Sequence, residues 1–373
     1  MGATGAGAIV GMLLVVGAYA TVLGLVRHND IYYLGADLYH WWIELFFVAY
    51  FTYAVAKRIT PGALVRNMIA ISIVLGSLTL IVVVLGSIGL ATGGGHKVAS
   101  LNIWRLEAGR GYPILLTLLL FASLRARVGL TQAWKLARFV GAALLLFALL
   151  ITLKRTMWLT FIGASVFLYL PKRFLKAGLV AAPVGLGGVA AVVALYPNAV
   201  IRALETVALT LTYNPNYTVE ETLGERVQQM ALLVPYMSDP IGYGFGAQFY
   251  TYWPGENTYG YVHYIHNLYV YDLLQLGYGG IALFVIAYAM LLKGLWNEIG
   301  KRSPYEWLAR GAFAATAAVL VSGLTLISTH TVFHGLVFGL GLVVAVEAKQ
   351  RSVQEKRVRQ RGLELANTGR IYS

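Results

Sequence analysis

The sequence of 373 residues contains no cysteine, which excludes disulfide bonds, thiolate metal sites and a cysteine nucleophile. Charged residues are scarce as well, at 12% of the chain, whereas a typical soluble protein has roughly 25%. Hydrophobic residues make up 58% of the chain, and its mean hydropathy is +0.68. Because so few ionic groups cannot coat a globule of this size, most side chains must face lipid. The sequence therefore predicts an all-α, polytopic integral membrane protein.

Two missing motifs narrow the class further. No GxxxxGK loop occurs, so the chain carries no ATPase module of that type. No Asp-x-Asp pair occurs either, which argues against a glycosyltransferase that depends on a metal and a nucleotide sugar. The net charge of +13 would suit nucleic acid only on a polar domain, and the sequence contains no such domain. We therefore expect no nucleic-acid partner.

Ten apolar runs are candidates for helices that cross about 30 Å of hydrocarbon. They span residues 8–26, 31–56, 67–91, 111–124, 136–153, 156–170, 177–195, 266–292, 311–328 and 332–346. The first run follows no basic residue and has no small-residue cleavage pattern, so we expect a retained helix and not a signal peptide. The predicted organisation is seven transmembrane helices in residues 1–195, a large outer loop in 196–265, three more helices in 266–346 and a basic cytoplasmic tail in 347–373.

The positions of the basic residues orient these helices. With the N-terminus inside, 21 of the 29 lysines and arginines fall on the inner side. This distribution obeys the positive-inside rule, so most of the net charge is a topology signal. The basic residues left on the outer side are Arg27, Lys97, Arg105, Arg110, Lys154, Arg155, Arg202 and Arg226.

The large outer loop is rich in aromatic residues. Such rings stack on the apolar faces of sugars, and they also settle at the membrane interface, so both roles stay open. Residues 220–235 predict an amphipathic helix that ends before Pro235. The following Gly242, Gly244 and Gly246 predict a tight, close-packed turn.

Three polar groups are predicted to lie at one height on the outer surface. Arg155 lies in the short connection between the fifth and sixth helices, Arg226 in the amphipathic segment, and His266 with Asn267 at the start of the eighth helix. Charged residues at this boundary are costly without a partner or a function. Two arginines suit a diphosphate, and a histidine suits removal of a proton from a hydroxyl. Structural alternatives are an interfacial cation for Arg155, an ion pair for Arg226 and a helix-entry hydrogen bond for His266.

These residues resemble the motifs of the O-antigen ligase and polymerase superfamily of polytopic inverting glycosyltransferases. The resemblance covers about residues 140–292. It rests on Arg-x-x-x-Leu at residues 155–159, on an outer-loop arginine followed by a proline and a Gly-x-Gly run, and on His-Asn-x9-Gly at residues 266–277. Family members usually have more helices than the ten predicted here, which leaves the acceptor side of the site open.

The resemblance implies the partners and the site. The donor would be a glycan linked through pyrophosphate to a polyprenyl lipid, undecaprenyl in bacteria, and the acceptor a glycan or a lipid-linked glycan. The reaction would take place at the periplasmic face of the bacterial inner membrane, without a cofactor, and a chain-length regulator is a candidate partner. Within the family pattern, Arg155 and Arg226 would bind the pyrophosphate, and His266, beside Asn267, would activate the acceptor.

Fewer observations support the remaining candidate site residues. Arg27, Arg105 and Arg110 are chosen only because they lie on the outer side. In the second helix, Asp37, His40 and Glu44 lie on one face at i, i+3 and i+7. Glu44 would lie well inside the membrane, so it should face the interior of the bundle, where it lines a substrate cavity or forms a structural pair.

A metal site is the least supported of the site hypotheses. His330 and His334 stand four residues apart, and His263 and His266 could join them. No carboxylate completes the set, so we expect no metal.

Four functions are compatible with these patterns. A polymerase is slightly favoured over a ligase that transfers glycan to lipid A core, because the outer side has about as many acids as bases, which suits an ordinary glycan acceptor. A glycosyltransferase that uses a monophosphate lipid donor, with Asp30 as its base, is an alternative. A transporter of lipid-linked glycans is another, motivated by Glu44, but the sequence shows no internal repeat.

Overall fold

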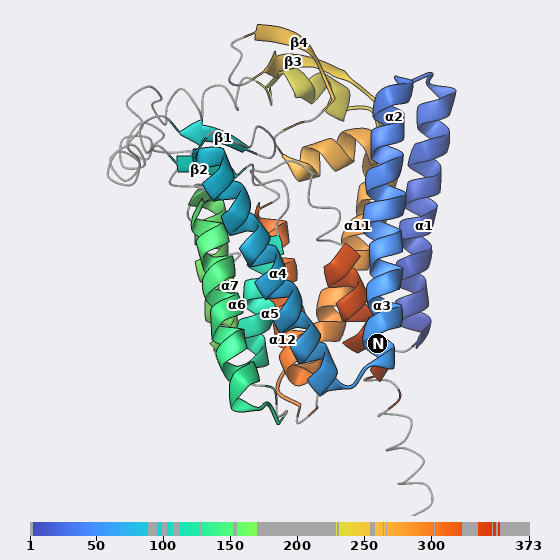
Figure 1. Cartoon of the computed structure of the whole chain (residues 1–373). Coiled ribbons are helices and arrows are strands. Elements are labelled where there is room, and N and C mark those ends of the chain that lie inside the picture. Colours follow the sequence, from blue (N-terminus) through green and yellow to red (C-terminus); the bar gives the residue numbers. More distant parts are fainter. Residues whose placement is uncertain are drawn as a thin grey trace, which may run out of the picture.

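The structure is a computed structural model in which the chain is mostly helical (Figure 1). It describes residues 3–88, 95–98, 103–106, 112–124, 126, 129–151, 155–169, 229, 231–253, 258–263, 265, 267–301, 303, 305–322, 335–344, 346–347 and 350. The predicted seventh span, residues 177–195, and the basic tail lie outside the described residues, apart from residue 347 and residue 350 of the tail.

Four of the described helices are long and apolar enough to cross a membrane. They span Gly7–Val26, Pro61–Ser87, Gln132–Leu150 and Leu268–Glu298. Shorter apolar helices cover Ile114–Ser123, Thr160–Tyr169 and Gly335–Val344. Together with the apolar composition, these helices identify an integral membrane protein, whereas the total of ten spans and the large periplasmic loop stay predictions.

The first two predicted spans form a pair of long rods. Helix α1 is Ala3–Val26, and the second rod consists of α2 (Ile31–Leu38), a π-helix η1 (Tyr39–Phe47) and α3 (Val48–Arg58). The backbone keeps right-handed helical angles through both junctions, so the predicted span 31–56 is one rod with a wider turn in its middle. A π-helix is rare and is frequently found at functional sites.

Helix α4, Pro61–Ser87, begins six residues before the predicted start at residue 67. Thr60 caps it, because its hydroxyl accepts a hydrogen bond from the Ala63 amide at 3.3 Å, and Pro61 occupies the first position. The apolar run marked only the part of the helix that follows Arg66.

The remaining helices agree with their predicted spans within a few residues, except that α11 ends at Glu298, beyond its predicted end, and α12 begins at Glu306, before its predicted start. They are α5 (Tyr112–Ser123), α6 (Gln132–Ile151), α7 (Arg155–Tyr169), α11 (Leu268–Glu298) and α12 (Glu306–Ser322), followed by a helix at residues 335–344. Helix α4 packs on α6, α5 and α7 pack on α12, and α1 packs on α11.

Two short hairpins depart from the all-α prediction. Strands β1 (Gly95–Val98) and β2 (Ile103–Leu106) pair antiparallel, as do β3 (Phe249–Trp253) and β4 (Thr258–Val262). In the second hairpin Tyr250 lies opposite Tyr261, and Tyr252 lies opposite Tyr259, which are the cross-strand aromatic pairs that stabilise sheets. Both hairpins lie at the same end of the helical bundle, β1 and β2 at the end of α4, and β3 and β4 near the start of α2 (Figure 1).

Candidate functional site

The eighth predicted span contains a break at the hairpin end of the bundle. Within α11, Gly277 has φ 65° and ψ −176°, which no helix contains. A segment at residues 240–247, which we call the glycine segment, crosses this break and binds the backbone there. The amides of Tyr243 and Gly244 donate to the carbonyls of Leu274 at 2.7 Å and Gln275 at 2.9 Å, and the Tyr278 amide donates to Pro240 at 3.0 Å. The segment thus satisfies polar backbone groups that the break leaves without helical partners.

The same segment is held on its other side by α1. The Phe245 amide donates to the carbonyl of Ala20 at 2.9 Å, and the Asn29 side chain donates to the carbonyls of Tyr243 and Phe245, both at 2.8 Å. Gly244 has φ 77°, and a Cβ there would overlap the backbone of Gly24 in α1. The predicted tight and close-packed turn is confirmed, and it holds α1 and α11 together.

A buried carboxylate organises the residues around this segment. Asp37 in α2 is 5% exposed. Its Oδ2 accepts from the Gly246 amide at 2.8 Å and from the Gln275 side chain at 2.7 Å. Its Oδ1 accepts from the Tyr271 hydroxyl at 2.8 Å and lies 3.1 Å from His263 Nε2. We call these five residues the Asp37 network; it joins α2, the glycine segment, the end of β4 and α11.

His263 is fixed on all sides by this network. Its Nδ1 lies 2.9 Å from the carbonyl of Ala247, which can only accept, so Nδ1 carries a proton. Tyr33 stacks on the imidazole with ring centroids 4.5 Å apart. A histidine held in this way orients its neighbours, and it leaves no ring nitrogen free for a metal.

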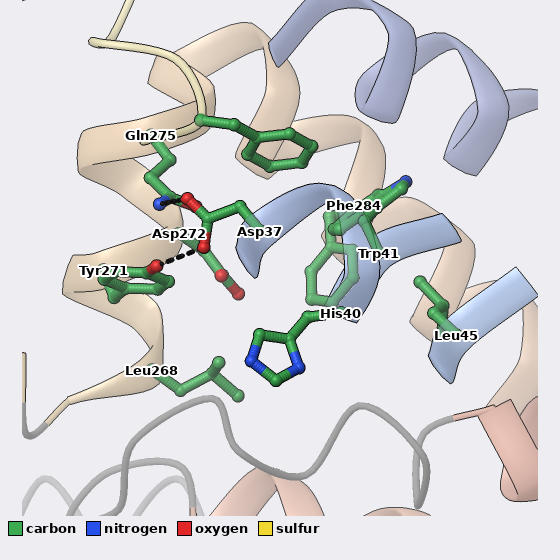
Figure 2. A pocket seen from close by; sticks show the side chains of 10 residues that line it. Asp37, His40, Trp41, Leu45, Leu268, Tyr271, Asp272, Gln275 and Phe284 are labelled. Carbon is green, nitrogen blue, oxygen red and sulfur yellow. Dashed lines mark hydrogen bonds between the residues drawn. The ribbon is translucent and has the colours of Figure 1, made fainter. Parts of the chain in front are cut away.

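A pocket lies below the network, between the second rod and α11 (Figure 2). The pocket opens to solvent, and the empty space counted within its outline, about 510 Å³, includes solvent outside its walls. The π-helix contributes His40, Trp41 and Leu45 to its wall. The other residues that line it are Asp37, Phe245, Leu268, Tyr271, Asp272, Gln275 and Phe284. A few polar groups among apolar walls are typical of a ligand pocket.

The comparison with known proteins bears on the same part of the chain. Residues 140–285 match the family model described as O-antigen ligase. These residues are therefore similar to the O-antigen ligase family. It confirms the resemblance to the O-antigen ligase and polymerase superfamily that the motifs of about residues 140–292 indicated, and members of this family are glycosyltransferase-like enzymes. No curated protein matches the chain.

The residues matched to the O-antigen ligase family include the three polar groups predicted to lie at one height, Arg155, Arg226 and His266 with Asn267. Arg155 is the first residue of α7, which begins at the hairpin end of the bundle (Figure 1). Asn267 caps α11, because its side chain accepts from the Val270 amide at 3.1 Å. His266 therefore directly precedes the cap of the helix that carries Tyr271 and Gln275, although His266 itself and Arg226 lie outside the described residues.

Arg27, which was selected only by its side of the membrane, has partners in the structure. Its guanidinium donates to Asp239 at 2.9 Å and lies 4.7 Å from the ring centre of Tyr243. The hydrogen bond from Arg27, with one from the Ile241 amide, lowers the pKa of Asp239. Burial raises the pKa of Tyr243. Arg27 thus has a structural role, because its contacts with Asp239 and Tyr243 hold the glycine segment against the end of α1.

The other candidates are less constrained. Arg105 lies in β2 opposite His96, and Glu44 lies in the π-helix. Arg110 lies outside the described residues, as do the metal candidates His330 and His334. Within the part of the chain that the structure describes, no three His, Asp or Glu residues are grouped to hold a metal ion.

Sequence reasoning missed Asp272, Tyr271 and Gln275. Asp272 had a signal, because an ionisable residue within a predicted membrane span is a functional candidate by default. Tyr271 and Gln275 had none, because only their contact with Asp37, more than 230 positions away in the chain, shows their role.

Proposed function

We propose that this protein is an inverting glycosyltransferase that joins an undecaprenyl-pyrophosphate-linked oligosaccharide to a sugar hydroxyl of an acceptor. The reaction takes place at the periplasmic face of a bacterial inner membrane. The observation that carries this proposal is the O-antigen ligase match, which spans Arg155, Arg226 and His266. The buried network beside the His-Asn motif supports it, since a site on rigid elements holds substrates in a defined geometry.

The proposed step needs no metal or cofactor. The acceptor oxygen attacks the anomeric carbon, the bond from that carbon to the pyrophosphate oxygen breaks, and the acceptor proton passes to His266. Arg155 and Arg226 stabilise the negative charge that develops on the leaving lipid pyrophosphate. A positioned base such as His266 contributes about 10²–10⁴ in rate. The polyprenyl chain stays in the bilayer, which is why the site belongs at the membrane interface.

The polymerase is the reaction we favour slightly. The predicted outer side has eight basic residues and a similar number of acids with many aromatics, which suits an ordinary glycan acceptor, and a chain-length regulator would then be a partner. The alternative is a ligase that transfers the glycan to lipid A core, and the description of the matching family supports it. In vitro transfer to lipid A core without chain elongation would decide for the ligase.

The monophosphate-donor alternative loses support from the structure. It requires Asp30 as a base. The Asp30 carboxylate instead caps α2, accepting from the Tyr32 amide at 2.9 Å, and lies 3.4 Å from the Gln248 amide nitrogen. Asp30 therefore has a structural role at the start of the second rod.

Purified protein incubated with polyprenyl-pyrophosphate glycan and candidate acceptors tests the proposal. Arg155→Ala and Arg226→Ala should each lower the transfer rate about 10²–10³-fold, since each removes a fixed charge that stabilises the transition state. Arg155→Lys should restore only part of the rate, because an ammonium lacks the guanidinium fork. The matched control is Lys154→Ala, the neighbouring cation, which should stay within a few-fold of wild type.

Other outcomes would reject parts of this assignment. Equal losses in Lys154→Ala and Arg155→Ala would mean that only the local charge matters. Transfer that survives His266→Ala but is abolished by Asp30→Asn would establish the monophosphate-donor reaction. Measured transport of the lipid-linked glycan with Arg155 and His266 both dispensable would establish a transporter.

A further inference from the structure

The pocket below the Asp37 network contains a second carboxylate that the network does not use. Asp272 is 7% exposed, and among the described residues its Oδ2 is buried without a hydrogen-bond partner. Figure 2 shows its carboxyl group directed into the space between Tyr271 and His40. A buried polar atom without a partner is costly, so its presence in a pocket wall indicates that a ligand supplies the missing donor.

The charges around the pocket restrict what this ligand is. The described residues that line it include two carboxylates, Asp37 and Asp272, and no arginine or lysine. A pyrophosphate group would be repelled here, because like charges strongly oppose each other in surroundings of low dielectric. A polyprenyl chain would enter without repulsion but has no hydrogen-bond donor for Asp272. The ligand must therefore be uncharged or cationic and must carry donors.

Part of the wall of this pocket is aromatic. Trp41 packs against Phe245 and Phe284, with ring centroids 5.7 Å and 6.0 Å from its own. Aromatic rings pack on the C–H faces of sugars, while carboxylates accept from the hydroxyls at the edge. A buried carboxylate beside this aromatic wall therefore offers both kinds of contact that a hexose makes.

We propose that this pocket is a sugar subsite, in which Asp272 accepts hydrogen bonds from the hydroxyls of an uncharged sugar and the buried Asp37 carboxylate beside it excludes acidic sugars. The inference rests on the proposed function, because the sugar is a unit of the glycan that is transferred. It divides the substrates between two regions of opposite charge. The arginines bind the pyrophosphate, and the carboxylates of the pocket bind the sugar.

The test uses the full chain in lipid nanodiscs and an array of neutral hexose and N-acetylhexosamine oligosaccharides beside matching hexuronic acid oligosaccharides. Wild type should bind neutral members and reject the acidic ones. Asp272→Asn, which has the same shape, should weaken neutral binding about tenfold, because one carboxyl oxygen becomes an NH₂ group that cannot accept a hydrogen bond. The control Asp30→Asn keeps a capping side chain outside the pocket and should change neither property.

A second variant covers the case in which Asp272→Asn does not fold. Phe284→Leu keeps the carboxylate and removes one ring of the wall, so it should weaken neutral binding and still reject acidic sugars. Melting temperatures of both variants, measured beside wild type, separate lost binding from lost folding.

The subsite and the proposed function fail in different ways. Binding of neutral sugars by wild type without any glycan transfer would contradict the proposed function and would still support the sugar subsite. Normal transfer with an unchanged KM for the glycan in Asp272→Asn and Phe284→Leu would overturn the subsite alone. Equal binding of neutral and acidic members by wild type, or binding of neither, would also overturn it.

Discussion

Replacing Gly277 by alanine tests the structure where the site depends on it most. At φ 65° and ψ −176°, Gly277 occupies a backbone region that is essentially open only to glycine. Forcing alanine into it costs about 1–3 kcal/mol. The new Cβ would also lie 2.5 Å from the Pro240 carbonyl oxygen and closer still to that of Ile241. Both contacts are with backbone, so no side-chain rotation relieves them.

The clash must therefore move the segment at residues 240–247 away from α11. That movement breaks at least one of the buried backbone hydrogen bonds of the segment, at about 1–3 kcal/mol each. The two terms together predict a loss of unfolding free energy on the order of 4 kcal/mol. The same movement would carry the Gly246 amide away from Asp37, so glycan transfer should fall together with stability.

Gly279, two residues further along α11, is the matched control. It has nothing within 4 Å of a built Cβ and keeps helical angles, so Gly279→Ala should be neutral or should stabilise the protein by up to about 1 kcal/mol. The assay is thermal unfolding of purified protein in detergent, followed by tryptophan fluorescence and by the folded fraction in size-exclusion chromatography. Melting of Gly277→Ala within a degree of wild type would refute the reasoning.

Two further predictions concern carboxylates. Asp37→Ala leaves three buried donors without their acceptor, namely the Gly246 amide, the Gln275 side chain and the Tyr271 hydroxyl, and should cost about 3–5 kcal/mol. The exposed cap variant Asp30→Ala should cost about 1 kcal/mol in the same melting assay, and equal losses would contradict the Asp37 network. The hydrogen bond from Arg27 lowers the pKa of Asp239 in the folded protein below its value of about 4 in the unfolded chain. The stability that this pair contributes is therefore fully present above about pH 4, and it is lost as the pH falls through the pKa of the folded state. The Asp239→Asn variant should therefore have a lower melting temperature than wild type at neutral pH and the same melting temperature at about pH 2. A difference in melting temperature that does not change with pH would show that the ionisation of Asp239 does not contribute to stability.

The sequence predicted the helices well because lipid imposes a length and a polarity on each span. Most described helices lie within a few residues of the apolar runs. The exceptions follow from polar residues that a hydropathy pattern does not read. Thr60 and Pro61 start α4 before the apolar run begins, and residues 293–298 prolong α11 beyond it. The predicted helix end before Pro235 was wrong, since residues 231–237 are helical and Ser238 closes the turn on the Pro235 carbonyl at 2.7 Å.

The hydropathy pattern could not predict the hairpins and the π-helix, for a different reason. Each depends on pairing or on local backbone choice within a short segment, and the alternating tyrosines of β3 and β4 also suit a membrane interface. The close-packed glycine turn was predictable, because Gly242, Gly244 and Gly246 alternate in a way that few other structures require.

For the candidate site too, the sequence predicted the local motifs and not the contacts between distant parts of the chain. The motif pattern found the part of the chain that matches the O-antigen ligase family, because spacing within a motif is local. It did not find the Asp37 network, because that network joins α2 to α11 across more than 200 residues. Asp37 and His40 were selected as one polar helix face, and the structure places both in the wall of the pocket, whereas their partners became visible only in the fold.

The most direct test of the central claim is the anomeric configuration of the transferred sugar, measured by NMR on the product, together with the amount of lipid released. An inverting transfer from lipid pyrophosphate predicts a configuration opposite to that of the donor and one undecaprenyl pyrophosphate released for each new glycosidic bond. Retained configuration, release of a monophosphate lipid, or no transfer to any sugar hydroxyl would contradict the account.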